Sequence, residues 1–293
     1  MAVAPWAPWM TGALGMMSAV ACNALSGVGD YEFDGVSNTG GASRTGNGVG
    51  GTGSGVGGGS GGTTTGVGGG SGGSGGAASE WFDLSFAYRR KLTIDNTSGT
   101  EQFEDFPVLV GLDDSRIDFG HAQSDGRDVR FVDEDDTTVL DYEIALWDVS
   151  NSLALVFVEA PQIPAGSNTR FIWMYYGNPS ATDAQDPAGT WSNGYEAVWH
   201  MDGSLEDSTG ANHDGTGSNV STIDGTIGFA QEFDGSSSYV SIGQTAGIAG
   251  LFAHGGTISA VIYAQTYGET NRGRIIDMST ATAFDNGWGL LLE

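Results

Sequence analysis

Short apolar segments alternate with turn residues from residue 81 to residue 178, and this pattern constrains the fold more than any other feature. The segments LTI, FPVLV, VRFV, YEIALW, LALVFVE and RFIWMYY are separated by Gly, Asp, Asn, Ser or Pro. Such a series predicts consecutive antiparallel strands. Helix is expected over no more than one turn, near residues 115–119. The DEDDTT run at 133–138 predicts a hairpin connection, because Asp favours turn conformations.

The net charge excludes one class of partner, and the cysteine count shows that disulfides cannot stabilise the fold. The formal net charge is −26, with 10 Lys and Arg residues against 36 Asp and Glu residues. Binding to nucleic acid depends on basic side chains that neutralise phosphates, so we exclude a nucleic-acid partner. The carboxylates are interpreted mainly as a solvated extracellular surface. Because the chain has 1 cysteine, no intrachain disulfide can form and the fold must be held by packed sheets.

The N-terminus is typical of an export signal. Residues 13–21 form an apolar run that suits a signal peptide and is too short to span a bilayer. The run ends in Ala19-Val20-Ala21 and is followed by Cys22, an arrangement that resembles a bacterial lipobox. The resemblance implies cleavage after residue 21 and lipidation of Cys22. It places the protein, lipid-anchored to a membrane, at the outer membrane or cell surface of a bacterium. Plain secretion and a wrongly assigned start remain the alternatives.

A linker rich in Gly, Ser and Thr is expected at residues 22–79. Much of the total of 50 glycines lies there, and residues 35–78 contain almost no large side chain. Such a segment cannot form a core and is predicted to be a disordered, flexible spacer. GxGxxG patterns recur in it, but a phosphate-binding loop needs a preceding strand and a following helix, and neither is expected here.

Five ordered blocks, YRRKLTIDN, FPVLV, DGRDVRF, YEIALW and MYYGN, resemble a domain of unknown function of bacteria and archaea. That family often stands beside lectin-like modules in exported proteins. The resemblance covers roughly residues 81–181, and we delimit an antiparallel β-sandwich domain at 80–182. The family brings no established activity and no catalytic residues.

A second module begins near Tyr195 and is delimited at residues 190–293. Its WHMDG, DSTG, FDGSSSYV and TISA blocks resemble the first half of a laminin-G-like domain, which has the jelly roll of the concanavalin A-like lectin/glucanase fold. The resemblance implies a C-terminally truncated jelly roll, because the chain ends at GWGLLLE in what reads as a buried strand. The expected fold class is therefore all-β throughout.

No catalytic constellation is recognisable in the sequence. A glucanase of the jelly-roll class carries acidic residues at alternate positions of one strand, so that they share one face of the sheet. Glu143 has no acidic residue two positions further on, and Asp148, five positions further on, would point to the opposite face. No GxSxG elbow precedes a helix. The histidines fit no zinc motif, and His200 is interpreted as a structural residue. We therefore predict that the chain is not an enzyme.

Calcium is the one cofactor that we retain. Laminin-G-like modules often bind calcium at a rim of loops, and the resemblance implies Asp207, Asn212 and Asp234 as ligands. Their oxygen atoms are hard donors of the kind that calcium prefers. The alternative is that Asp207 and Asp234 simply cap turns. The DEDDTT run is not an EF-hand, since Thr138 and Ile144 stand where such a loop needs Gly and Glu.

Two functions from different classes follow. The first is a non-catalytic cell-surface lipoprotein that binds extracellular glycans or proteins as an adhesion or recognition module. The second is the accessory N-terminal region of a larger exported hydrolase whose catalytic part is absent from this chain. The sequence identifies no ligand-binding residue for either function, because aromatic residues that stack on sugars look the same as core aromatic residues.

Overall fold

The computed structural model describes residues 81–225, 228–243, 245–266, 273–278 and 287–292. The expected signal peptide, Cys22 and the linker at 22–79 lie outside these residues. The described chain consists mainly of β-strands that pair antiparallel, with very little helix. The all-β sandwich prediction is therefore confirmed. None of the described helices is both long and apolar enough to cross a membrane.

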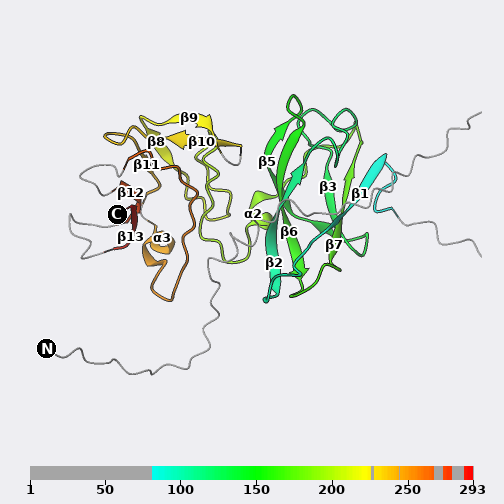
Figure 1. The fold of residues 1–293 in the computed structure, drawn as a ribbon, viewed down its shortest axis with the longest axis horizontal. Coiled ribbons are helices and arrows are strands. Elements are labelled where there is room, and N and C mark those ends of the chain that lie inside the picture. Colours follow the sequence, from blue (N-terminus) through cyan, green and yellow to red (C-terminus); the bar gives the residue numbers. More distant parts are fainter. Residues whose placement is uncertain (1–80, 226–227, 244, 267–272, 279–286, 293) are drawn as a thin grey trace, which may run out of the picture.

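Two antiparallel sheets pack face to face in the first part of the chain, on the right of Figure 1. Sheet A has the order β1 (Tyr88–Thr93), β7 (Phe171–Tyr176), β3 (Arg130–Asp133) and β4 (Val139–Leu140). Sheet B has the order β2 (Phe103–Leu112), β6 (Leu153–Ile163) and β5 (Tyr142–Asp148). The predicted hairpin is present between β3 and β4, where the amide of Asp133 donates to the carbonyl of Thr138.

The core between the sheets forms because buried and more exposed residues alternate along the strands. On β6, Ala154, Val156, Val158 and Ala160 are fully buried, and the residues between them are more exposed. On β7 the residues Ile172, Met174 and Tyr176 face the same core. Each fully buried Val stabilises the fold by about 1.5–3 kcal/mol relative to an exposed one. This core makes sheet B a rigid base for the segments that follow it.

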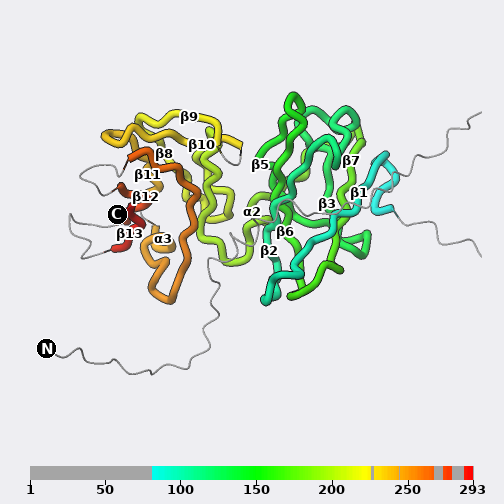
Figure 2. Tube along the Cα trace, in the orientation of Figure 1, coloured from blue at the N-terminus to red at the C-terminus, as the bar shows by residue number. Residues whose placement is uncertain are grey.

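The later part of the chain contains shorter elements, on the left of Figures 1 and 2. Its strands are β8 (Thr216–Ser218), β9 (Ser221–Asp224), β10 (Phe229–Glu232), β11 (Tyr239–Ser241), β12 (Gly273–Asp277) and β13 (Gly289–Leu292). Within the described residues they form three two-stranded ladders, β8 with β11, β9 with β10, and β12 with β13. One short helix, α3 (Ala246–Gly250), lies among them.

A short helix that we did not predict, α2 (Pro187–Thr190), stands between the two parts (Figure 1). The Asp186 carboxylate caps it by accepting from the amide of Gly189 at 2.9 Å, and Pro187 occupies its first turn. An Asp followed by Pro is a recognised start of a helix, so the sequence carried the signal. The chain leaves sheet A at β7, passes through α2 and returns to cover one face of sheet B.

Candidate ligand-binding site

A cleft of about 390 Å³ opens between α2 and the segment at 200–208. Its lining combines apolar surface with many polar groups. Five carboxylates contribute, from Glu143, Asp186, Asp202, Glu206 and Asp207. The imidazole of His200 and the hydroxyls of Ser204 and Ser208 complete the polar groups, and Pro187 and Ala188 add a small apolar wall. The cleft is thus acidic and rich in hydrogen-bonding groups.

The buried carboxylate of Glu143 on β5 joins three segments at the base of the cleft. Its Oε2 atom accepts a hydrogen bond from Trp191 Nε1 at 2.6 Å and lies 2.9 Å from His200 Nε2. Its Oε1 atom accepts from the hydroxyl of Ser208 at 2.7 Å. We call these four residues the Glu143 cluster. Because both oxygens have partners, the cluster fastens the chain after α2 to the sandwich.

The electrostatics of the cluster favour a charged Glu143. Burial raises the pKa of Glu143, but the hydrogen bond and charge of His200, together with the hydrogen bonds from Trp191 and Ser208, outweigh burial and leave the pKa below its usual value. At neutral pH Glu143 is therefore an ionised acceptor. An ionised carboxylate accepts hydrogen bonds and has no proton to donate.

Aromatic packing fixes the side chains of the cluster against β6. The ring of Phe157 lies 4.8 Å from the ring of Trp191 and is stacked on His200 at 5.4 Å, measured between centroids. Tyr195 packs edge-on against Trp191 at 5.0 Å. These contacts hold the base of the cleft in one geometry, since the rings are confined on several sides.

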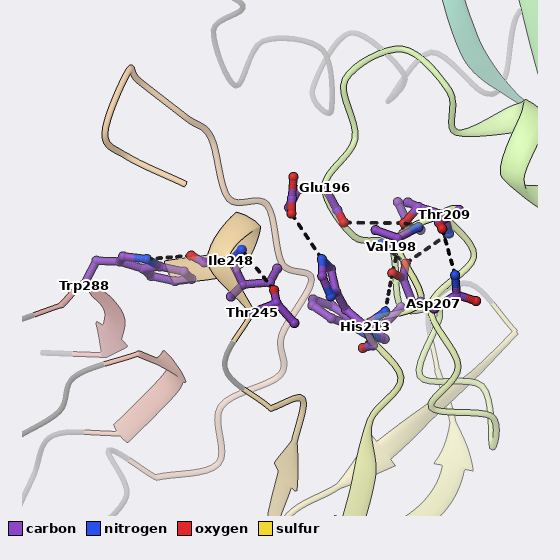
Figure 3. Close-up of polar contacts among 12 residues, drawn as sticks. Glu196, Val198, Asp207, Thr209, His213, Thr245, Ile248 and Trp288 are labelled. Carbon is purple, nitrogen blue, oxygen red and sulfur yellow. Dashed lines mark hydrogen bonds and ion pairs between the residues drawn. The ribbon is translucent and has the colours of Figure 1, made fainter. Parts of the chain in front are cut away.

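Asp207 organises the loop that forms the far wall (Figure 3). Its carboxylate accepts from the amides of Val198, Thr209 and His213 at 2.9–3.0 Å, and from the hydroxyl of Thr209 at 2.9 Å. Burial raises the pKa of Asp207, but these hydrogen bonds outweigh it and leave the pKa below its usual value. The Nε2 atom of His213 lies 3.1 Å from Oε1 of Glu196. The wall is therefore set by buried polar contacts.

The residues predicted to hold calcium each bond within their own loops. Asn212 is exposed and donates to the carbonyl of Gly210 at 2.7 Å. The Asp234 carboxylate accepts from the amides of Ser236, Ser237 and Ser238 and from the hydroxyl of Ser237. No hydrogen bond joins Asp207, Asn212 and Asp234 to one another. In the part of the chain that the structure describes, no group of three or more His, Cys, Asp or Glu side chains could hold a metal ion.

The Glu143 cluster was not found from the sequence. The available signal was an acidic residue inside an otherwise apolar strand, YEIALW, because a buried carboxylate needs partners. Those partners lie 48 to 65 positions away along the chain, so no local pattern could identify them. The interpretation of His200 as a hydrogen-bonded structural residue agrees with its contact with Glu143.

Comparison with known proteins gives one match. No curated protein and no solved structure matches the chain. The model of a family described as "Domain of unknown function (DUF2341)" matches residues 125–216. This range contains all four residues of the Glu143 cluster and ends where β8 begins. The expectation of a domain of unknown function is confirmed, but the match begins at residue 125 and continues to residue 216, beyond the predicted end at 182. The lipid anchor and the laminin-G-like module stay predictions.

Proposed function

We propose that the chain is a non-catalytic, lipid-anchored surface protein of a bacterium that binds extracellular glycans or proteins, and that the ligand occupies the cleft beside α2. The observation that carries this proposal is the cleft itself, which combines a volume of about 390 Å³ with convergent carboxylate and hydroxyl groups. Concave sites with a few convergent polar groups are where proteins usually bind small ligands or single residues of larger ones.

The lining indicates the chemistry of the ligand. Carboxylates and serine hydroxyls accept hydrogen bonds from the hydroxyl groups of a sugar, and the carboxylates also attract an amino group. An anionic ligand is disfavoured, because five carboxylates border the cleft. We therefore expect a neutral or amine-bearing glycan, or a basic side chain of a protein.

The state of Glu143 supports the non-catalytic part of the proposal. Its two oxygens hold Trp191, His200 and Ser208, and its pKa lies below the usual value. A general acid requires the opposite shift, toward or above neutral pH. The same binding role fits the second candidate, an accessory region of a larger exported hydrolase, since such a region also holds the substrate.

The experiment compares two variants of the full chain. An immobilised glycan array selects the ligand, and titration calorimetry then measures its affinity. Glu206→Gln removes a charge from the cleft wall, where the side chain makes no hydrogen bond within the described residues. Loss of a charge-assisted hydrogen bond should weaken binding by about tenfold. Glu101→Gln makes the same change on the exposed loop before β2 and should leave the affinity unchanged. Equal affinity for both variants would contradict a site in the cleft.

A further inference from the structure

An imidazole group lies at the base of the acidic cleft. His200 lines the cleft, and its side chain is 18% exposed. The ring is stacked on Phe157 and lies 6.0 Å from the ring of Trp191, measured between centroids. These contacts fix the imidazole while part of it stays open to solvent. Among the described residues that line the cleft, His200 is the one whose side chain can gain a positive charge.

The contact with Glu143 determines which nitrogen of His200 carries a proton in the neutral ring. Nε2 of His200 lies 2.9 Å from Oε2 of Glu143. Because Glu143 is ionised at neutral pH, this oxygen accepts hydrogen bonds and has no proton to donate. Nε2 is therefore the nitrogen that carries the proton and donates it to the hydrogen bond. A second proton on the ring then binds at Nδ1.

Uptake of that second proton changes the charge of the cleft and leaves its geometry in place. The Nε2–H group still donates to Glu143 after Nδ1 is protonated, so the link between His200 and β5 persists. The neighbouring strand β6 contributes the uncharged ring of Phe157. The charged groups that face the imidazole are carboxylates, namely Glu143 on β5, Asp186 at the start of α2, and Asp202, Glu206 and Asp207 in the segment at 200–208. An imidazolium among them makes the cleft less negative.

We propose that His200 makes binding in the cleft dependent on pH: a ligand with an ammonium group is held while His200 is neutral and is released when the imidazole becomes charged. This inference rests on the proposed function and adds its regulation. Histidine is the side chain that ordinarily changes its charge between about pH 5 and pH 8. An imidazolium repels an ammonium group and competes with it for the same carboxylates. A mildly acidic medium therefore empties the cleft of such a ligand.

The expected size of the effect follows from Coulomb's law. With the two cations about 6–8 Å apart in a partly solvated cleft, their repulsion weakens binding by about threefold to tenfold. Proton and ligand affect each other equally, so the bound ammonium group hinders protonation of His200 by the same factor. A neutral sugar lacks this repulsion, and its affinity should change little with pH.

The test uses the full chain and 2-aminoethyl β-glucoside as the probe, because its alkylammonium group stays charged over this pH range. Methyl β-glucoside is the neutral probe with the same ring. NMR titrations at about pH 5.5 and about pH 8 measure both affinities. The wild type should bind the amino glycoside about threefold to tenfold more weakly at the lower pH. His200→Gln keeps a donor for Glu143 and should lose most of this difference. His254→Gln, an exposed histidine outside the cleft lining, is the matched control and should behave like the wild type.

The Cε1–H resonance of His200 gives a second readout that needs no ligand. It is identified by its absence from the spectrum of His200→Gln, and its chemical shift should change between about pH 5 and pH 8. Addition of the amino glycoside should move the midpoint of this change to lower pH. Asp141 and Glu159, whose pKa values are raised by burial, also take up protons as the pH falls, but their contribution remains in His200→Gln.

Three results would overturn the proposal: no binding of the amino glycoside at either pH, the same pH dependence in His200→Gln as in the wild type, or a His200 resonance that does not titrate. Circular dichroism establishes that each variant is folded. Failure of the proposed function would look different, because the glycan selected on the array would then bind Glu206→Gln as tightly as the wild type. Weaker binding of that glycan by Glu206→Gln, together with equal affinity for the amino glycoside at both pH values, would contradict the pH dependence alone.

Discussion

Glu143 on β5 holds together segments that are distant in the sequence, and its energetic role follows from its three donors. Trp191, His200 and Ser208 all bond to its carboxylate in a buried setting. Without the charge of Glu143, the three donors lose a strong acceptor. Leaving one buried polar group unsatisfied lowers the free energy of unfolding by about 1–3 kcal/mol. The same carboxylate explains why the cleft has a fixed base.

The first prediction concerns Glu143→Gln. The amide is nearly isosteric, but its NH₂ group must face one of the donors that the carboxylate accepted. We expect the free energy of unfolding to fall by about 1–3 kcal/mol in urea denaturation monitored by tryptophan fluorescence. Glu101→Gln, on an exposed loop, should change it by less than about 0.5 kcal/mol. A Glu143→Gln protein as stable as the wild type would show that the cluster contributes nothing to the fold.

The pH dependence of stability gives a second prediction. The pKa values of Glu143 and Asp207 are lowered in the folded state, so the folded state binds protons less readily than the unfolded state at these sites. Their stabilisation is present above the unfolded pKa values and is lost as the pH falls through the folded ones. The pKa values of Asp141 and Glu159 are raised by burial and by neighbouring carboxylates. Protonation of these two groups at low pH therefore stabilises the folded state.

The wild type and Glu143→Gln should therefore differ most in stability near neutral pH. The difference should shrink as the pH is lowered below the usual pKa of a glutamate, because Glu143 of the wild type then becomes protonated. Urea titrations at a series of pH values measure it. A difference that stays constant over this range would mean that the charge of Glu143 does not contribute.

Two glycines provide a third prediction at the same scale. Gly177 follows β7 with φ +84°, and a Cβ atom there would lie 2.5 Å from Cδ2 of Tyr88. Gly166 has a similar φ of +61° but has no atom within 4 Å of such a Cβ. Gly166→Ala should cost about 1–2 kcal/mol for the left-handed conformation alone, and Gly177→Ala should cost more because the Tyr88 ring must also move. Equal losses in urea denaturation would show that the close approach to Tyr88 has no energetic consequence.

At the scale of elements, the sequence predicted what depends on local alternation and missed what depends on distant contacts. The strands of the sandwich and the hairpin at 133–138 were recognisable because apolar residues alternate and Asp residues mark the turn. The pairing of β1 with β7, and of β2 with β6, joins residues far apart along the chain, and no local pattern specifies it. The Glu143 cluster escaped prediction for the same reason, and α2 was missed although its Asp-Pro start was visible.

Hydrogen exchange at the level of strands gives a fourth prediction. The central strands β6 and β7 each have a partner on both sides and bury alternate residues in the core. The strands β8 to β13 form ladders of two strands, and an isolated pair of strands is only marginally stable. Amides of β6 and β7 should therefore exchange most slowly, with β8 to β13 faster. Equal protection in both parts, measured by mass spectrometry, would contradict this order.

At the scale of the whole molecule, the proposed ligand site lies where the chain after α2 returns to sheet B. The cleft there is bordered by carboxylates. The DUF2341 match spans the residues that build the base of the cleft. A ligand of the cleft should therefore be neutral or carry an amino group.

Hydrogen exchange of the full chain with and without the glycan selected on the array tests the cleft most directly. Binding in the cleft should slow exchange in α2 and at residues 200–208, because ligand contacts stabilise those segments against opening. Exchange on the outer face of sheet A should stay unchanged with a neutral glycan. Protection confined to β8 to β13 or to sheet A, with none around α2 and residues 200–208, would contradict a ligand site in this cleft.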